Sequence, residues 1–243
     1  MRSYRFQGLL ATALLTGLLG CELAGTDHSR LSLPPPAPVP DSVAEAYRAD
    51  AHQLAVRRMV EDEQRSPTIS DDRVQRFYRA LAHVYHAEGI PGRDSILAIH
   101  TFPRYNLHEI IVGVDSTAGW VQSWREGQRL TGHTPVDALV EQYGLLLDEY
   151  LDFAPAAVLR SEEPINPVAL SAQFEDLQGV RYAEQNAYAG GGDDIRAEVL
   201  DNALRLHYTR AWGDCPAGCI HETRWTFRVH ENGTVTFVEK TSN

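Results

Sequence analysis

The spacing of apolar residues changes along this chain, from a helical period in its first half to strand-like alternation at its end. Apolar side chains from Val74 to Tyr85 recur every three or four residues, which is typical of the buried face of an α-helix. Near the C-terminus Trp225, Phe227 and Val229 alternate, which places them on one face of a strand. Helices followed by mostly antiparallel strands define the α+β class. We therefore expect N-terminal helices packed against a mostly antiparallel sheet, with a strand-rich C-terminal third.

The last two strands predict a β-hairpin whose register can be derived from its residues. A two-residue turn would put the apolar residues of the two strands on opposite faces, because a slip of one residue inverts every side chain. A three-residue loop at 231–233 instead pairs Val229 with Val235 and Phe227 with Phe237. This register buries both apolar sets together, and Gly233 then takes a left-handed conformation.

The remaining elements follow from caps, breakers and periodicity. Expected helices span about 42–63 and 70–89, a short segment after Ser116, a longer segment from Thr134 through Leu151, and a segment opening at Asn166. Expected strands span 96–101, 110–114, 180–184, 195–200 and 204–209, and the first two would form a hairpin through the loop 102–106.

Composition limits the classes of partner. The 243 residues include 33 acidic and 22 basic residues, a formal net charge of −11, which argues against a general nucleic-acid binder. Lys240 is the single lysine, which argues against Schiff-base and P-loop chemistry. We expect residues 41–243 to form one α+β domain, which could divide into subdomains of about 41–160 and 161–243.

The N-terminus has the features of an export signal. Arg2 and Arg5 precede a 13-residue run from Gly8 to Gly20 that is too short to span a bilayer. The run ends in Leu18-Leu19-Gly20-Cys21, which resembles the lipobox of bacterial lipoproteins. The resemblance implies a signal peptide at 1–20, lipidation of Cys21 and a lipid anchor in the membrane of the bacterial cell envelope, on its exported side. The alternative is an ordinary secretory signal with an incidental cysteine.

A proline-rich stretch follows the lipobox. Residues 34–40 read Pro-Pro-Pro-Ala-Pro-Val-Pro, which predicts a stiff, extended backbone. We therefore expect residues 21–40 to be a tether between the lipidated cysteine and the domain. His83 and His86 lie beside arginines on the second helix, off its apolar stripe, and we expect them on a solvated face.

The segment 212–221 is the most distinctive in the domain. Cys215 and Cys219 are separated by a bend containing proline and glycine, and in an exported protein such a pair predicts a disulfide. A metal site that adds His221, or a redox pair, are the alternatives. The segment is similar to one in uncharacterised secreted bacterial proteins, which implies kinship and no activity. Trp212, Asp214 and His221 are the candidate binding residues here.

A second candidate site is the glycine run 190–192 followed by Asp193 and Asp194. Glycines allow close approach of a ligand, and paired carboxylates suit hard cations, but the spacing is that of no calcium loop or dinucleotide fingerprint. A loop between strands is the alternative interpretation.

No pattern of catalytic residues emerges from the sequence. The zinc-protease pattern that begins at His108 and at His221 lacks its second histidine, and serine-hydrolase and Walker patterns do not occur. We expect no metal and no cofactor, and catalytic residues are unassigned. The leading hypothesis is a membrane-tethered, non-catalytic binding lipoprotein whose partner is an envelope protein, peptide or carbohydrate and not a nucleic acid. The alternative is a cell-envelope hydrolase or metal-dependent enzyme.

Overall fold

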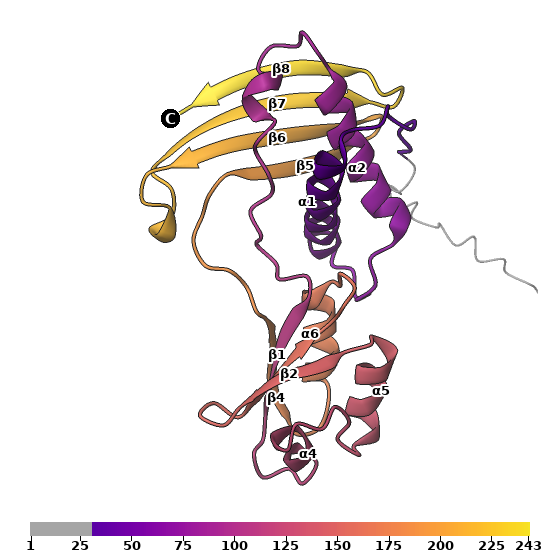
Figure 1. Ribbon diagram of the computed structural model, residues 1–243, viewed down its shortest axis with the longest axis vertical. Coiled ribbons are helices and arrows are strands. Elements are labelled where there is room, and N and C mark those ends of the chain that lie inside the picture. Colours follow the sequence, from indigo (N-terminus) through magenta and orange to yellow (C-terminus); the bar gives the residue numbers. More distant parts are fainter. Residues whose placement is uncertain (1–30) are drawn as a thin grey trace, which may run out of the picture. The chain divides into compact units, whose positions relative to one another are not determined.

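The computed structural model describes residues 31–243, which contain six α-helices and two antiparallel four-stranded sheets (Figure 1). The helices are α1 (Asp41–Glu61), α2 (Asp71–His86), α3 (Arg93–Ile96), α4 (Val121–Arg125), α5 (Thr134–Gln142) and α6 (Pro167–Glu175). The strands are β1 (Glu109–Val114), β2 (Leu146–Leu151), β3 (Ala156–Arg160), β4 (Val180–Gln185), β5 (Asp194–Leu200), β6 (Ala203–Trp212), β7 (His221–His230) and β8 (Val235–Ser242). The α+β class expected from the sequence is therefore confirmed.

The C-terminal sheet has its strands in chain order, β5-β6-β7-β8, and helices α1 and α2 cover it (Figure 1). The helices contribute Tyr47, Leu54 and Phe77 to the first hydrophobic core, and the sheet contributes Leu206 and Phe227. N-terminal helices thus bury their apolar faces on strands that lie more than 100 residues later in the chain.

The second sheet has the order β2-β3-β1-β4, with α4, α5 and α6 packed around it. Its core includes the fully buried side chains of Trp124, Val140, Leu159, Leu170 and Phe174. Asn166 caps α6, because its side chain accepts a hydrogen bond from the backbone N–H of Ala169 at 3.3 Å.

The segment 109–185 that builds the second core is inserted between the two halves of the first. The two cores therefore do not follow a division of the chain near residue 160. An isolated bridge pairs Thr68 with Ile165. The backbone N–H of Asn166 adds a hydrogen bond to the carbonyl of Pro67 at 2.8 Å.

The expected hairpin register is confirmed. Val229 pairs with Val235 and Phe227 with Phe237, and Gly233 has a φ of 82°. The loop closes with the N–H of His230 donating to the carbonyl of Thr234 at 2.8 Å. A bulge between Thr226 and Phe227 interrupts the ladder with β8.

Two expectations about the middle of the chain are wrong. Residues 96–101 form no strand and hence no hairpin with β1: Ile96 and Ile99 are both buried at helical spacing, and a turn joins them with a 2.9 Å hydrogen bond. The helix from Thr134 ends at Gln142, because Gly144 turns the backbone left-handed with a φ of 60°. Residues 146–151 are strand β2, and β3 was not anticipated.

The proline-rich stretch has no helix or strand, and the part of the chain that begins it packs against α2. Leu33 is 1% exposed in the first core. Arg79 donates to the carbonyl of Leu33 at 2.7 Å, and the imidazoles of His83 and His86 bond to the carbonyls of Pro34 and Ala37 at 3.0 Å. His83 is thus half-buried under this stretch, whereas His86 is exposed, as expected, and also contacts it. Cys21 and the signal segment lie outside the described residues.

Candidate functional site

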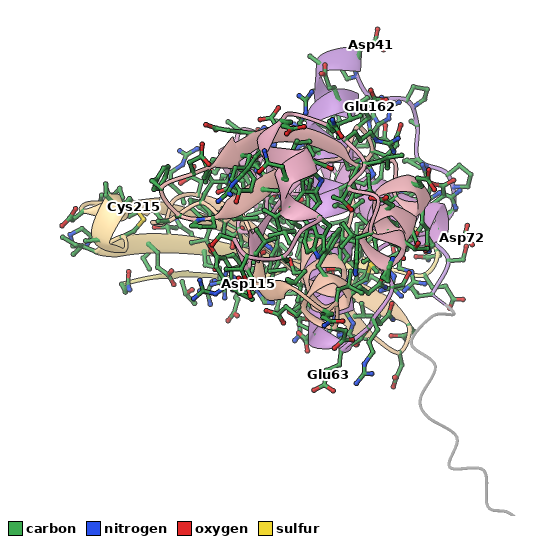
Figure 2. The ribbon with its side chains drawn as sticks, turned by 90° about the horizontal axis from the view of Figure 1, so that it is seen from below. Asp41, Glu63, Asp72, Asp115, Glu162 and Cys215 are labelled. Atoms are coloured by element: carbon green, nitrogen blue, oxygen red, sulfur yellow. A yellow bond between two sulfur atoms is a disulfide. The ribbon has the colours of Figure 1, made fainter. Side chains whose placement is uncertain are left out.

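A polar cavity of about 390 Å³ lies beside the C-terminal sheet, and we call it the arginine cavity. It is lined by Arg57, Phe102, Arg104, Tyr188, Gly190, Gly191, Gly192, Asp194, Arg196, Thr209, Ala211, Cys219, Glu222 and Arg224. Four arginines and two acidic residues give this lining an excess of positive charge, although the chain as a whole is acidic. Acidic residues elsewhere, among them Asp41, Glu63 and Glu162, are exposed at the periphery (Figure 2).

Arg57 and Asp194 join three segments of the chain at this cavity. The two side chains are 12% and 14% exposed, and their nearest charged atoms are 2.8 Å apart. Arg57 also donates to the carbonyls of Phe102 and Ile195 at 2.6 and 2.7 Å. Asp194 accepts from the N–H of Phe102 at 2.9 Å and pairs with Arg196 at 3.2 Å. Asp194 therefore fixes helix α1, the connection before β1 and the start of β5.

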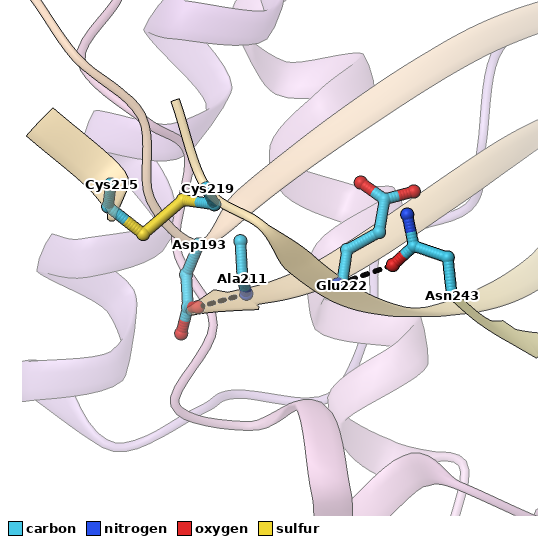
Figure 3. The surroundings of a disulfide bond; sticks show 6 residues. All are labelled: Asp193, Ala211, Cys215, Cys219, Glu222 and Asn243. Atoms are coloured by element: carbon cyan, nitrogen blue, oxygen red, sulfur yellow. Dashed lines mark hydrogen bonds between the residues drawn. A yellow bond between two sulfur atoms is a disulfide. The ribbon is translucent and has the colours of Figure 1, made fainter. Parts of the chain in front are cut away.

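The disulfide loop forms another wall. The sulfurs of Cys215 and Cys219 are 2.23 Å apart, at disulfide distance, at the outer end of the β6–β7 hairpin (Figures 2 and 3). The N–H of Gly191 donates to the carbonyl of Cys215 at 2.8 Å. Gly190 has a φ of 103°, and a Cβ there would come within 3.3 Å of the Cys215 carbonyl oxygen, so glycine at this position allows the two loops to lie against each other.

The structure separates the predicted candidate residues. Asp193 accepts a hydrogen bond from the N–H of Ala211 at 2.8 Å (Figure 3), whereas Asp194 binds Arg57. Trp212 and His221 face each other across β6 and β7 with ring centroids 5.7 Å apart, and both are exposed. Asp214 is exposed at the start of the 3-10 turn Cys215–Ala217. Of these residues, only Asp194 lines the arginine cavity.

A second cavity, of about 430 Å³, borders the first through Tyr188, and we call it the histidine cavity. It is lined by Ala46, Ala49, Asp50, His52, Gln53, His100, Thr101, Pro103, Tyr105, Asn106, Leu107, His108, Pro164 and Tyr188. The connection 100–107 contributes to both cavities.

Asp50 and His100 form an oriented pair in the histidine cavity. Asp50 is 2% exposed and accepts from His100 Nδ1 at 2.8 Å and from the N–H and hydroxyl of Thr101 at 2.7 and 2.8 Å. The hydrogen bond to Asp50 raises the pKa of His100, and partial burial opposes the increase. The Nε2 atom of His100 has no hydrogen-bond partner within residues 31–243. Such a pair can hold a neutral imidazole with Nε2 ready to accept a proton.

The pair lacks the partners that covalent catalysis requires. No serine or cysteine lines the histidine cavity, and the hydroxyl of Thr101, which does line it, donates to Asp50 at 2.8 Å. Water or a substrate hydroxyl is therefore the nucleophile that this pair would activate. In the described part of the chain, no three His, Cys, Asp or Glu residues converge as a metal site. Cys215, Cys219 and His221, the alternative metal site considered from the sequence, therefore do not form such a group.

Sequence reasoning did not find Arg57, Asp50 or His100. The available signal was Asp50, a charged residue in the first helix that follows Tyr47 by three positions and so shares its buried face. A buried carboxylate requires compensating donors, which points to a polar partner elsewhere in the chain. Nothing in the sequence identifies that partner, because His100 is fifty residues away and lies outside any helix or strand.

The fold and the site define an α+β protein with an arginine-lined cavity next to a disulfide-closed loop. Comparisons with family models, with curated proteins and with solved structures found no match to this chain. In the part that the structure describes, no helix has the length and apolar character needed to cross a membrane.

Proposed function

We propose that this protein is a lipid-anchored protein of the bacterial cell envelope whose domain binds a small polar ligand in the arginine cavity without chemically changing it. The anchor is supported by the lipobox pattern ending at Cys21 and by the basic residues and apolar run before it. Two or more acyl chains hold a protein on a membrane without help from a basic patch, so an acidic domain is compatible with this anchor.

The observation that carries the binding function is the composition of one cavity. The arginine cavity brings charged and aromatic side chains from distant segments around a volume typical of small-molecule sites. Its walls are fixed by the Arg57–Asp194 pair and by the disulfide loop. A cavity with fixed walls loses little conformational entropy on binding, which favours affinity for a ligand of matching shape and charge.

Binding without turnover can be tested with the full-length protein in detergent. We expect fractions of a water-soluble envelope extract to raise its melting temperature, because a ligand that binds only the folded state stabilises it. Mass spectrometry of the active fraction, before and after prolonged incubation, should recover the ligand unchanged. Consumption of the ligand with formation of a product would refute the non-catalytic function, and failure of every fraction to shift the melting temperature would refute binding.

The second candidate function is a hydrolase that uses the histidine cavity. The Asp50–His100 pair supports it, because an oriented imidazole can act as a general base toward water. If the extract ligand is hydrolysed, substituting His100→Gln should abolish the turnover and preserve the ligand-induced shift in melting temperature. Turnover that persists in that variant would exclude His100 as the base.

The anchor is tested separately. The Cys21→Ala variant should leave the membrane fraction or accumulate as an unprocessed precursor, because it lacks the thiol that would carry the lipid. Labelling with radioactive palmitate should mark the wild-type chain and not the variant. Normal processing and membrane retention of Cys21→Ala would contradict the lipoprotein proposal and leave ligand binding unaffected.

A further inference from the structure

The charges of the arginine cavity indicate which class of ligand it takes. Arg57, Arg104, Arg196 and Arg224 line it together with two carboxylates, Asp194 and Glu222, so the lining has two more positive than negative groups. This excess is local, because acidic residues outnumber basic ones by 33 to 22 in the whole chain. A ligand with two negative charges would neutralise the lining.

The four arginines differ in how much of each guanidinium is already engaged. Arg57 is nearly buried and is held by Asp194 and two carbonyls, so it is part of the wall. Arg224 donates to Glu222 at 2.9 Å and contacts the Thr209 hydroxyl at 3.4 Å, which leaves one terminal nitrogen without a bond in the described residues.

Arg104 and Arg196 have the most donors to offer. Arg104 is exposed, and its side chain makes no hydrogen bond or ion pair within residues 31–243. Arg196 is 65% exposed and contacts Asp194 through Nε alone, so its two terminal nitrogens have no partner there either. The planar guanidinium donates two parallel hydrogen bonds to carboxylate or phosphate oxygens, a geometry that favours these anions over a point charge.

The uncharged walls limit the size of the ligand. Gly190–Gly192 lie against the disulfide loop and Phe102, and Gly190 has a φ of 103°, so a larger residue would be strained there. Phe102 and the exposed ring of Tyr188 add apolar surface beside the charges. The cavity of about 390 Å³ therefore suits a small molecule with a charged end and a compact body.

We propose that the arginine cavity binds small dianions, namely phosphate monoesters or dicarboxylates, through Arg104 and Arg196, with Arg224 as a third donor. This inference rests on the proposed binding function and specifies its ligand class. The charged oxygens would accept hydrogen bonds from the two exposed guanidinium groups, while the Arg57–Asp194 pair keeps the wall in place.

The test uses isothermal titration of the full-length protein in detergent with inorganic phosphate, malonate and acetate at constant ionic strength and mildly alkaline pH, where phosphate is mostly a dianion. We expect saturable binding of phosphate or malonate. Acetate should bind at least about tenfold more weakly, because a monoanion neutralises only one of the two excess positive charges of the lining. Absence of saturable binding of both dianions at millimolar concentrations would overturn the proposal, as would equal affinity for acetate.

Paired variants assign the binding to this cavity. The double variant Arg104→Gln/Arg196→Gln should bind the dianion at least about tenfold more weakly. The matched control, Arg125→Gln/Arg160→Gln, removes the same charge from two partly exposed arginines, one on α4 and one on β3 of the second sheet. This control should bind the dianion like wild type. Equal weakening in the control would show a general charge effect and overturn the site. Circular dichroism confirms that each variant is folded before titration.

Two further experiments complete the test. The first distinguishes a lipid headgroup from a free anion, and the second distinguishes the proposed binding function from the assignment of a dianion ligand. Because the proposed lipid anchor would insert into any vesicle, a lipid headgroup is tested by the excess of capture on phosphatidylglycerol vesicles over phosphatidylcholine vesicles. An excess that free phosphate abolishes indicates the same site, and an excess that phosphate does not reduce counts against it. If the envelope extract stabilises wild type and Arg104→Gln/Arg196→Gln equally, the binding function stands and the dianion assignment fails.

Discussion

At the scale of single residues, Glu63 has an unusual backbone. Its φ of 51° is the one positive value at a non-glycine residue within the described part of the chain. The N–H of Glu63 donates to the carbonyl of Val60, and that of Gln64 to Met59, at 3.1 and 2.9 Å. These two bonds form a Schellman motif at the end of α1, in which glycine is the preferred residue.

Substituting Glu63→Gly should therefore increase the free energy of unfolding by about 0.5–1 kcal/mol, because it relieves the left-handed conformation. Urea titration followed by circular dichroism measures the change. The control Glu45→Gly, at an exposed position within the same helix, should lower stability by about 1 kcal/mol. Destabilisation by both variants would contradict the proposed role of position 63.

Two histidines should titrate in opposite directions from the ordinary pKa of about 6.5. The hydrogen bond to Asp50 raises the pKa of His100, whereas burial, aided by the charge of Arg224, lowers that of His207. NMR titration of the imidazole signals should place His100 above and His207 below the ordinary value. The Asp50→Asn variant should bring the pKa of His100 down without moving that of His207.

The same shifts determine how stability depends on pH. Because the folded pKa of His100 is raised, its contribution is complete below about pH 6.5 and is lost as the pH rises through the folded value. The stability advantage of wild type over His100→Gln should therefore shrink from mildly acidic to alkaline pH. The contribution of His207 depends on pH in the opposite direction. Because its folded pKa is lowered, this contribution is present above about pH 6.5 and is lost as the pH falls through the folded value.

At the scale of elements, the sequence predicted those structures whose signals are local. The hairpin register followed from which residues had to share a face, and α6 followed from the Asn166 cap and its proline. The predicted end of the helix from Thr134 is wrong because Leu147, Tyr150 and Leu151 continue the helical spacing of apolar residues. The signal that ends the helix is Gly144, whose φ of 60° permits the turn into β2.

The disulfide loop is an element whose stability effect can be calculated from its length. Closing a five-residue loop contributes about 2 kcal/mol by the chain-entropy estimate. Reduction of the wild-type protein should lower its free energy of unfolding by about that amount and increase its mass by two hydrogen atoms. The Cys215→Ser/Cys219→Ser variant should not respond to the reductant. Two free thiols in the exported protein would refute the disulfide.

At the scale of the whole molecule, the candidate sites depend on contacts that the sequence does not reveal. Arg57 and Asp194 are 137 residues apart, and Asp50 and His100 are 50 apart. Both pairs hold the connection 100–107, which has no periodic pattern. Pairing across an irregular connection requires the three-dimensional fold, so the arginine cavity was predicted only in part, through Asp194 and the glycine run.

The Arg57–Asp194 pair should be important for the whole fold. The Asp194→Ala variant should lose about 3–5 kcal/mol, because it leaves Arg57 nearly buried without its counter-charge. The control Glu198→Ala, also on β5, removes the carboxylate of an exposed pair with Arg205 and should cost less than about 1 kcal/mol. In a double-mutant cycle, Arg57→Ala/Asp194→Ala should lose less than the sum of the single variants.

The insertion of residues 109–185 has a consequence for the order in which the chain can fold as it emerges N-terminus first. The second core closes once β4 has appeared, so this segment can complete its packing early. Helices α1 and α2 can pack on each other, but the sheet that completes their core is absent until strands β5 to β8 have appeared. Newly emerged chains therefore expose the apolar surface of α1 and α2 that the sheet later covers, which is the kind of surface that a chaperone binds.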